Sequence, residues 1–441
     1  MKLFFKECRN IAGSVVFLLL IVVLVFNYAT QFSGAVGHME RDYNNGTEGI
    51  DGFNSLLVEP KPGRENYGYV QGEVPEQVIP AAAESLYWEY ENNSYTTYPI
   101  GFVKIVKLNQ DEQEEIAGML QTITGMSVEG LREILKSGTT GQAVITDENG
   151  NVIEELPQLH LETAIGYSEF QELMQRADDM LGGGSKYALE NLYRFGSRPV
   201  TYEEAMTNYK EVMENDKITG AAARLYCDYT GIMLALFSVF VPVAFMLRDR
   251  RAKMQELIYV RKISSLKFIA VRFASITAMI MLPVFLMSLI PLVQLELFAA
   301  KNGLETDILA FVKYIAVWLL PTVLFTVSAG MFFTVLTDTP IGIPIVLIYA
   351  FIGVFANSTS INGGNYGFEL AIRHNSLEGY GRMMENIGAL ILNRMVYAGT
   401  ALLLLIASVV IYELKRRGRI DAAGKLEKIW RNISKTNTKA A

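Results

Sequence analysis

The sequence predicts a membrane protein, an all-α bundle of six transmembrane helices with an inserted extracellular α+β domain. Three observations lead to this fold class. Hydrophobic residues make up 51% of the chain, but they are concentrated in blocks, and only 19% of the residues are charged. Six stretches contain no charged residue at all. Between the first two of them lies a long acidic segment with turn and strand signals.

Each uncharged stretch supplies the about 20 mostly apolar residues that a helix needs to cross roughly 30 Å of hydrocarbon. A single charge near the centre of such a helix would cost about 2.5–3.5 kcal/mol on insertion. Helices buried in soluble proteins rarely reach this length without a polar face. The stretches run from Asn10 to Met39, Tyr229 to Leu247, Phe273 to Leu295, Tyr314 to Thr337, Thr339 to Phe368 and Met395 to Tyr412.

Basic residues predict the orientation, because positive charge near the ends of spans stays on the cytoplasmic side. Arg248–Arg272 contains eight Lys or Arg and two acids, and the tail from Lys415 contains nine and two. The head, Met1–Asn10, carries three basic residues and one acid. We therefore expect both termini and residues 248–272 to lie in the cytoplasm. Residues 31–225 are then expected on the extracellular side of the membrane. A bacterial cytoplasmic membrane fits best.

Four regions follow from this topology. Residues 1–30 form the N-terminal segment and the first transmembrane helix, and residues 31–225 form the extracellular domain, with 32 acidic and 14 basic residues. Residues 226–414 form a five-helix region with a cytoplasmic loop at 248–272, and residues 415–441 form a basic cytoplasmic tail. An alternative is that the first span is a signal peptide, cleaved near Ser33-Gly34-Ala35. Cys8 and Cys227 fall on opposite sides of the membrane and cannot form a disulfide within one chain.

Local patterns in the acidic segment predict both strands and helices. Tyr95–Leu108 is rich in aromatic and β-branched residues, typical of a strand. Two segments flanking Asn149-Gly150 predict a hairpin. Capping-box spacing predicts helix starts at Ser168 with Gln171 and at Thr201 with Glu204, and the glycines from Gly182 end the first of these helices. Helices are also expected over Asp111–Thr124 and Val128–Lys136, and the hairpin strands over Gln142–Thr146 and Val152–Glu155.

Two connections between the spans have an amphipathic pattern. In the basic loop, Met254, Leu257, Ile258 and Arg261 share one helical face, and Ser264-Ser265 is a plausible cap for the next helix. This loop is interpreted either as a docking element or as a solvated loop that only sets orientation. Leu370–Asn393 either re-enters the membrane or forms an ordinary surface loop.

The motifs of enzymes and of ion-coupled transport are missing. There is no Gly-x-x-x-x-Gly-Lys-[Ser/Thr] phosphate loop, and the three histidines are too scattered for metal-ligand spacing. Asp228, Lys313, Arg394 and Glu413 fall near the ends of the uncharged stretches, which disfavours a proton or sodium relay at depth. We therefore expect no catalytic residue, no metal, no cofactor in this chain and no nucleic-acid partner. The substrate-binding residues stay unknown.

The layout resembles the type-2 ABC export permeases. One span, a large outer domain and five further spans carry the resemblance, together with the run Arg248–Arg261 and the closing segment Leu392–Arg417. The resemblance implies an elbow helix at Met1–Asn10. It also implies a coupling helix that seats in a cytosolic ABC ATPase, formed here by Met254, Glu256, Leu257, Ile258, Tyr259 and Arg261. Glu256 matches the glutamate of the family, whereas Tyr259 replaces its glycine.

The resemblance implies that the chain is the permease half of an ATP-driven exporter. ATP and Mg would be bound by the partner ATPase, and a second permease copy or a paralogue would complete the transporter within membrane lipid. The alternative is a surface receptor or scaffold whose extracellular domain binds a partner. A membrane enzyme is disfavoured because catalytic groups are missing. The acidic domain either steers a cationic substrate or serves solubility.

Overall fold

The computed structural model describes residues 2–33, 59–63, 67–98, 104–137, 141–146, 152–158, 165–252, 254, 258–260, 262–356, 367–374, 377 and 379–419. The chain divides into two compact units. One, the helical unit, comprises Met1–Pro60 and Met206–Ala441, and the other, the inserted unit, comprises Lys61–Ala205. The inserted unit is narrower than the predicted domain, 31–225, because residues 219–225 belong to a long helix of the helical unit.

The described chain starts with two helices, α1 (Lys2–Ala12) and α2 (Val15–Asn27), and α2 continues into a π turn, η1 (Tyr28–Phe32). Ser14 explains the break between them. Its hydroxyl accepts a hydrogen bond from the Phe17 N–H at 3.3 Å and donates to the Ile11 carbonyl at 2.8 Å. The Ser14 side chain therefore caps the start of α2 and holds the end of α1.

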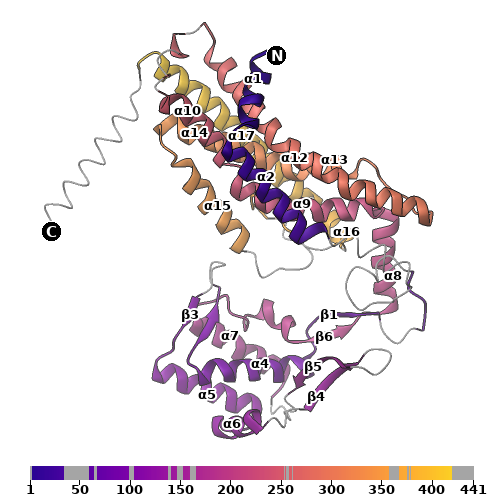
Figure 1. Ribbon diagram of the computed structural model, residues 1–441. Coiled ribbons are helices and arrows are strands. Elements are labelled where there is room, and N and C mark those ends of the chain that lie inside the picture. Colours follow the sequence, from indigo (N-terminus) through magenta and orange to yellow (C-terminus); the bar gives the residue numbers. More distant parts are fainter. Residues whose placement is uncertain are drawn as a thin grey trace, which may run out of the picture. The chain divides into compact units, whose positions relative to one another are not determined.

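Five helical segments of the described residues are long and apolar enough to cross a membrane (Figure 1). They are α2 with η1; α9 (Thr219–Phe237) with α10 (Phe240–Arg251); α12 (Ser265–Asn302); α13 (Ala310–Tyr314) with η4 (Ile315–Leu319) and α14 (Leu320–Thr337); and α17 (Ile387–Arg416). These five establish a multi-pass membrane protein.

The sixth expected span corresponds to α15 (Gly342–Ala356). Its 15 residues rise about 22 Å at 1.5 Å per residue, less than the roughly 30 Å of a hydrocarbon core. The described residues stop at its end, so a sixth complete span stays a prediction.

The helices extend beyond the uncharged stretches that predicted them. The helix α9 begins ten residues before Tyr229 and includes Arg224, which is fully buried and lies 2.7 Å from the carboxylate of Asp216. Similarly, α12 begins at Ser265 and includes Arg272, and α17 begins at Ile387. A charged residue that has a buried partner can lie inside a transmembrane helix. Stretches defined by the absence of charge end at such a residue and are therefore shorter than the helix.

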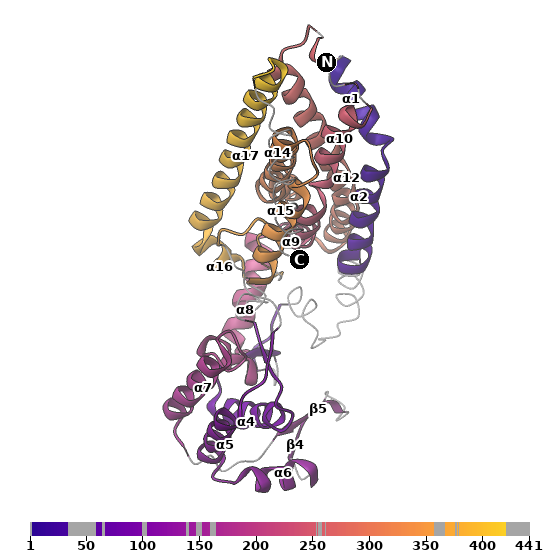
Figure 2. The same ribbon diagram turned by 90° about the vertical axis from the view of Figure 1, so that its left-hand side faces the viewer.

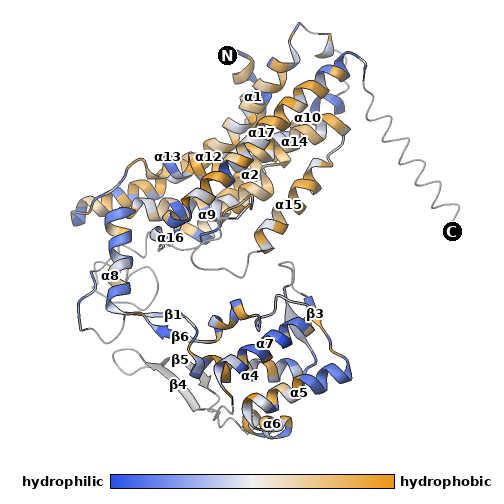
Figure 3. Cartoon of the chain, turned by 180° about the vertical axis from the view of Figure 1, so that it is seen from behind, coloured by the Kyte–Doolittle hydropathy of each residue, from blue (hydrophilic) through white to orange (hydrophobic). Residues whose placement is uncertain are grey.

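The helix α14 lies at the centre of the helical unit. It contacts α9, α10, α12, α15 and α17, and Figure 2 shows it between α17 on one flank and α2 on the other. Gly330 permits the closest approach, because a Cβ atom there would lie 2.9 Å from Pro242 of α10. Figure 3 shows hydrophobic residues along α12, α14, α15 and α17, in contrast to the hydrophilic surfaces of the inserted unit.

The inserted unit is mostly helical. Its core residues come mainly from three helices, and they include Leu86, Leu120 and Phe170. The helices are α4 (Pro75–Glu91), α5 (Gln110–Thr124), α6 (Val128–Ser137), α7 (Tyr167–Leu181), the 3-10 helix η2 (Leu189–Phe195) and α8 (Tyr202–Lys210), which continues into the π turn η3 (Glu211–Asn215) of the helical unit.

Three antiparallel pairs of short strands accompany these helices, so the described residues contain no larger sheet. The pairs are β1 (Tyr69–Gln71) with β6 (Ser197–Pro199), β2 (Tyr95–Thr97) with β3 (Lys104–Val106), and β4 (Gly141–Thr146) with β5 (Val152–Gln158). The hairpin predicted around Asn149-Gly150 is confirmed as β4 and β5. The single strand expected over Tyr95–Leu108 is instead the pair β2 and β3.

The predicted helix ends have mixed outcomes. The capping box at Thr201 is confirmed, since Thr201 and Glu204 exchange side chain to backbone hydrogen bonds at 3.2 and 3.0 Å. The one at Ser168 is wrong, because α7 already begins at Tyr167 with Gly166 as its N-cap residue. Gly182 ends α7 with a φ of 88°, as expected for a glycine cap.

Glu204 also holds β6 against the start of α8. Arg198 donates to its two carboxylate oxygens at 2.8 and 2.6 Å. Together with the Thr201 N–H, these bonds lower the pKa of Glu204 to about 2. This value lies below the ordinary 4.5, so ionised Glu204 stabilises the folded state. This stabilisation is complete above pH 4.5 and is lost as the pH falls through about 2.

We expect Glu204→Gln to destabilise β6 and the first turn of α8 at neutral pH by less than about 1 kcal/mol, since both side chains of the ion pair are more than one-third exposed. The difference in local stability between the variant and the wild type shrinks as the pH falls from 4.5 towards 2. Hydrogen exchange of peptides covering 197–210 measures it. Glu190→Gln, an exposed carboxylate in η2, is the control, and an equal effect there would contradict the assignment.

Candidate functional site

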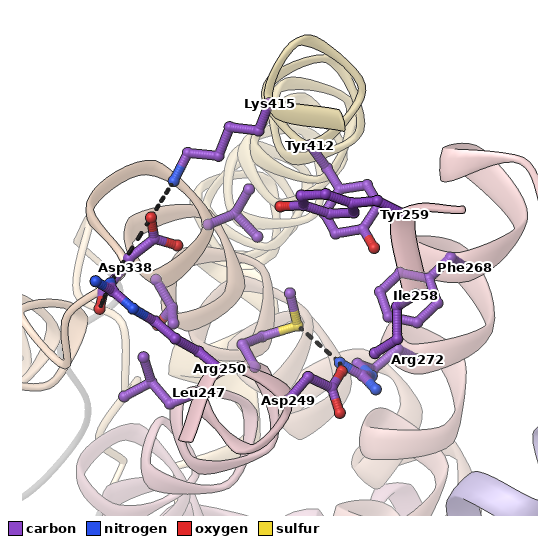
Figure 4. A pocket seen from close by; sticks show the side chains of 13 residues that line it. Leu247, Asp249, Arg250, Ile258, Tyr259, Phe268, Arg272, Asp338, Tyr412 and Lys415 are labelled. Atoms are coloured by element: carbon purple, nitrogen blue, oxygen red, sulfur yellow. Dashed lines mark hydrogen bonds and ion pairs between the residues drawn. The ribbon is translucent and has the colours of Figure 1, made fainter. Parts of the chain in front are cut away.

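The helical unit has a basic end, which we define as the region where the start of α12 and the ends of α10, α14 and α17 come together. Residues of these helices and two residues of the connecting loop line a hollow that contains about 460 Å³ of empty space, open solvent included. Figure 4 shows its charged and aromatic side chains. The lining residues are Met246, Leu247, Asp249, Arg250, Ile258, Tyr259, Phe268, Arg272, Thr334, Val335, Asp338, Tyr412 and Lys415.

Arg272 of α12 joins three helices at the basic end. Its guanidinium lies 2.8 Å from the Asp249 carboxylate of α10 and 3.5 Å from Glu7 of α1. It also lies over the ring of Phe268, 4.4 Å from the centroid. Arg248 adds a second cation, 3.6 Å from Glu7. The Arg272 side chain is only 4% exposed, so its charge depends on these carboxylates.

Asp338 forms a second junction, directly after α14. Its φ is 57°, a left-handed conformation that Asp and Asn adopt more readily than most residues. The Lys415 ammonium of α17 lies 2.7 Å from its carboxylate. Arg250 of α10 donates to its carbonyl at 2.6 Å and lies 3.7 Å from its carboxylate. One residue thus binds the ends of two neighbouring helices (Figure 4).

The loop between α10 and α12 is attached to α17. Arg416 donates to the carbonyls of Tyr259 and Ile263, at 2.9 and 2.6 Å. The ring of Tyr259 meets Tyr412 edge-on at 5.5 Å, and Tyr412 stacks on Phe268 at 5.1 Å. The Ser265 hydroxyl donates to Glu413 at 2.5 Å. Tyr259 of the loop therefore contacts α17 directly and is connected to α12 through the ring of Tyr412.

The residues predicted for coupling are only partly described. Ile258 and Tyr259 line the hollow, and Met254 is 41% exposed. The Ile258 N–H donates to the Met254 carbonyl at 3.1 Å, the spacing of one helical turn. Glu256, Leu257 and Arg261 lie outside the described residues, so the predicted helical face remains untested.

Sequence reasoning missed the partners of the loop. Arg272, Lys415 and Arg416 were counted only as positive charges that set orientation. The carboxylates Asp249, among the arginines that end α10, and Asp338, at the end of the uncharged α14, were the available signal, because a partly buried carboxylate needs a cation or hydrogen-bond donors. Which helix supplies that cation depends on the packing. Among the described residues, no cluster of His, Cys, Asp and Glu is suited to a metal.

A second polar cluster lies at the opposite ends of α14 and α17. It surrounds Gly367–His374, which we call the buried strap, a segment that contains no helix. Leu370, Ala371 and Ile372 of the strap are buried, with at most 4% exposed. Irregular backbone inside an apolar bundle must find hydrogen-bond partners there.

Side chains of α14 and α17 supply those partners. The carbonyls of four successive strap residues each accept at least one hydrogen bond. Asn393 donates to Gly367 and, at 3.1 Å, to Glu369; Tyr397 donates to Phe368 at 2.7 Å; Arg394 donates to Glu369 at 3.1 Å; and Thr322 donates to Leu370 at 2.8 Å. The backbone of the strap thus has side-chain partners on α14 and α17 over four successive residues.

Arg394 is the central donor of this cluster and is 4% exposed. Besides the strap, its guanidinium donates to the Trp318 carbonyl and the Thr322 hydroxyl, both at 2.9 Å, and to Asn393. At the other end of the strap, the carboxylate of Asp228 accepts from the His374 N–H at 3.1 Å and lies 3.2 Å from Arg373. Helices α9, α14 and α17 therefore all bind the strap.

Comparison with known proteins gives one match. A family model described as ABC-2 family transporter protein matches residues 11–412. The matched region includes the inserted unit, the buried strap and most of the basic end, but not Glu7, Lys415 or Arg416. No curated protein and no solved structure matches the chain.

We expect Arg272→Met to lower the free energy of unfolding by about 3–5 kcal/mol, because it leaves the Asp249 carboxylate without its nearest cation. Denaturant unfolding of the purified full chain in detergent measures the loss. Lys267→Met, an exposed lysine on the same helix, is the control and should stay within about 0.5 kcal/mol of wild type. Equal losses in the two variants would contradict a role for the ion pairs.

We expect Arg394→Met to raise amide exchange in residues 367–374 by about tenfold or more, the effect of losing one strong charge-assisted hydrogen bond. Arg394→Lys should restore the protection of these amides only in part, since an ammonium lacks the planar fork of donors with which a guanidinium reaches several acceptors. Hydrogen exchange with mass spectrometry reports the change. Arg382→Met, an exposed arginine of α16 (Tyr380–Glu385), should leave the strap as protected as in wild type.

Proposed function

This chain belongs to the ABC-2 family of transporter proteins, and we propose that it is the membrane permease subunit of an ATP-driven exporter with a separate cytosolic ATPase. The observation that carries the proposal is the attachment of the loop at Tyr259 to α17 and α12. A loop that only set orientation would not need to be fixed to the transmembrane helices. A loop that transmits a conformational change from a partner protein needs to be fixed to them.

In this proposal the basic end faces the cytoplasm and the loop of residues 252–264 binds the ATPase. Two apolar side chains of the loop are available for it. Val260 is 82% exposed and Met254 is 41% exposed. Burial of these side chains against a partner would remove apolar surface from water, which favours association. Together with Glu256, Leu257, Ile258, Tyr259 and Arg261, these residues form the proposed coupling element.

ATP and Mg bind to the partner, and this chain converts the partner's closure into helix movement. A displacement of Tyr259 pushes on Tyr412 and Arg416 of α17. The ion pair between Asp249 and Arg272 makes α10 and α12 follow together. ATP binding then biases the bundle towards one of two arrangements, because the partner binds them with different free energies. A second permease copy or a paralogue forms the other half of the pathway.

The inserted unit lies outside the cell in this topology. For an exporter this is the side where the substrate leaves. The acidic surface of the inserted unit attracts cationic molecules, and salt should weaken that attraction. The chemical nature of the substrate is not part of the proposal.

Capture of the tagged full chain from its native host in mild detergent tests the proposal. We expect an ABC ATPase in near-equal amount, identified by mass spectrometry. Val260→Asp, and the pair Glu256→Ala with Leu257→Asp, should abolish its recovery, because a charge in place of an apolar anchor opposes burial. Leu189→Asp, an exposed apolar residue of the inserted unit, is the matched control and should keep the ATPase.

Two results would contradict the proposal. Recovery of other partners without any ATPase, across several detergents, would favour a receptor or scaffold. Recovery of the ATPase unchanged in all the loop variants would leave the family role intact but move the coupling element elsewhere.

A further inference from the structure

The hollow at the basic end contains cationic groups with unused hydrogen-bond donors. An arginine side chain has five N–H donors and a lysine ammonium has three. Within the described part of the chain, Arg250 donates one hydrogen bond, to the carbonyl of Asp338, and Lys415 donates one, to the carboxylate of the same residue. Both cations therefore keep donors that point at no protein acceptor in the described residues.

The composition of the hollow favours an anion. Three cations and two carboxylates line it, which leaves one positive charge in excess. The rest of the lining is largely apolar and aromatic, with Leu247, Val335 and Phe268 among its members. Arg250 is 46% exposed, so an incoming ligand can reach the cationic side without a path through the bundle.

The position of the hollow specifies the source of the anion. It lies at the ends of four candidate membrane spans. Three of them have basic residues at this end: α10 and α17 in their last turns, and α12 in its first turn. Here the chain passes from hydrocarbon to water, at the depth of lipid headgroups. Basic pockets between helices at this depth bind anionic headgroups.

We propose that this hollow binds the phosphate of an anionic lipid, held by Arg250 and Lys415 with the acyl chains lying along the apolar helix surfaces. The guanidinium offers paired donors that match phosphate oxygens. The lysine contributes a compact charge beside it. Asp338 is the intramolecular competitor, because it holds both cations when the site is empty of lipid.

The bound lipid would act on the loop. Tyr259 and Tyr412 form the wall opposite Asp338 (Figure 4). Filling the hollow restricts the movement of these rings and hence of the loop that Arg416 holds. Anionic lipid thus becomes a regulator of the coupling element; this consequence rests on the proposed function, whereas lipid binding itself does not need the ATPase.

Native mass spectrometry of the purified, delipidated full chain tests the site, with phosphatidylglycerol and phosphatidylcholine added back in turn. We expect retention of phosphatidylglycerol over phosphatidylcholine. Arg250→Gln with Lys415→Gln should weaken phosphatidylglycerol binding by about tenfold or more, the value of one hydrogen bond to a charged group. Arg251→Gln with Lys267→Gln removes two exposed charges from the same end and should weaken binding less, through general attraction alone.

Asp338→Asn should change the affinity for phosphatidylglycerol in the opposite direction. Asn keeps the shape, the backbone carbonyl that accepts from Arg250 and the tolerance of positive φ, but it removes the carboxylate charge that pairs with Lys415 and lies 3.7 Å from Arg250, so phosphatidylglycerol should bind more tightly than in wild type. A loss of binding in this variant as well would mean that binding follows the integrity of the bundle, and would overturn the site. Equal binding of the two lipids would overturn it too.

Inorganic phosphate alone separates the two sources of the ligand. We expect it to compete only weakly with phosphatidylglycerol, because it has no acyl chains to contact the apolar lining. Competition as strong as that of added phosphatidylglycerol would assign the hollow to a free phosphate compound and overturn the lipid assignment. The capture of an ATPase is measured independently, so failure of either proposal can be recognised separately.

Discussion

A charged side chain inside an apolar helix bundle must find a partner there, and this requirement organises the helical unit. Arg224 meets Asp216, Arg272 meets Asp249, and Arg394 meets backbone carbonyls. Breaking such a contact leaves a buried charge or carbonyl without compensation, which costs more than the contact gains over an apolar pair. The helices are therefore fixed to one another at defined points, rather than only by interchangeable apolar packing.

The two polar clusters differ in what they hold. At the basic end the contacts join helix termini to a loop, and several of the side chains are partly exposed, so the attraction is screened and the contacts can exchange. Around the buried strap the donors are almost fully buried and the acceptors are backbone carbonyls. These bonds are worth about 0.6–1.7 kcal/mol each in membrane proteins, but several act on the same eight residues. The strap is thus held by buried hydrogen bonds, whereas some of the contacts at the basic end, such as that of Arg250, are open to solvent.

The sequence predicted features that depend on one segment at a time. The uncharged stretches located five spans, and the capping box at Thr201 was found because both of its residues are three positions apart. The helix α4 was missed, because Pro80 within it and the turn signals before it hid its apolar face. The strap and the hollow could not be predicted, since each depends on three or more segments that are distant in sequence. Arg394 was noted only as a charge near the end of a span.

The helices α14 and α17 carry both clusters, which connects the loop to the strap. On α17, Arg394 and Tyr397 bind the strap and Tyr412 and Arg416 bind the loop. A helix of 30 residues is about 45 Å long and transmits a push along its axis as a rigid rod. A shift of α17 relative to α14 would strain the strap, because Thr322 of α14 and Arg394 of α17 both donate to the Leu370 carbonyl, at 2.8 and 3.4 Å. Movement at the basic end must therefore either carry both helices together or release the strap, and in the proposed mechanism the two arrangements of the bundle would differ in this choice.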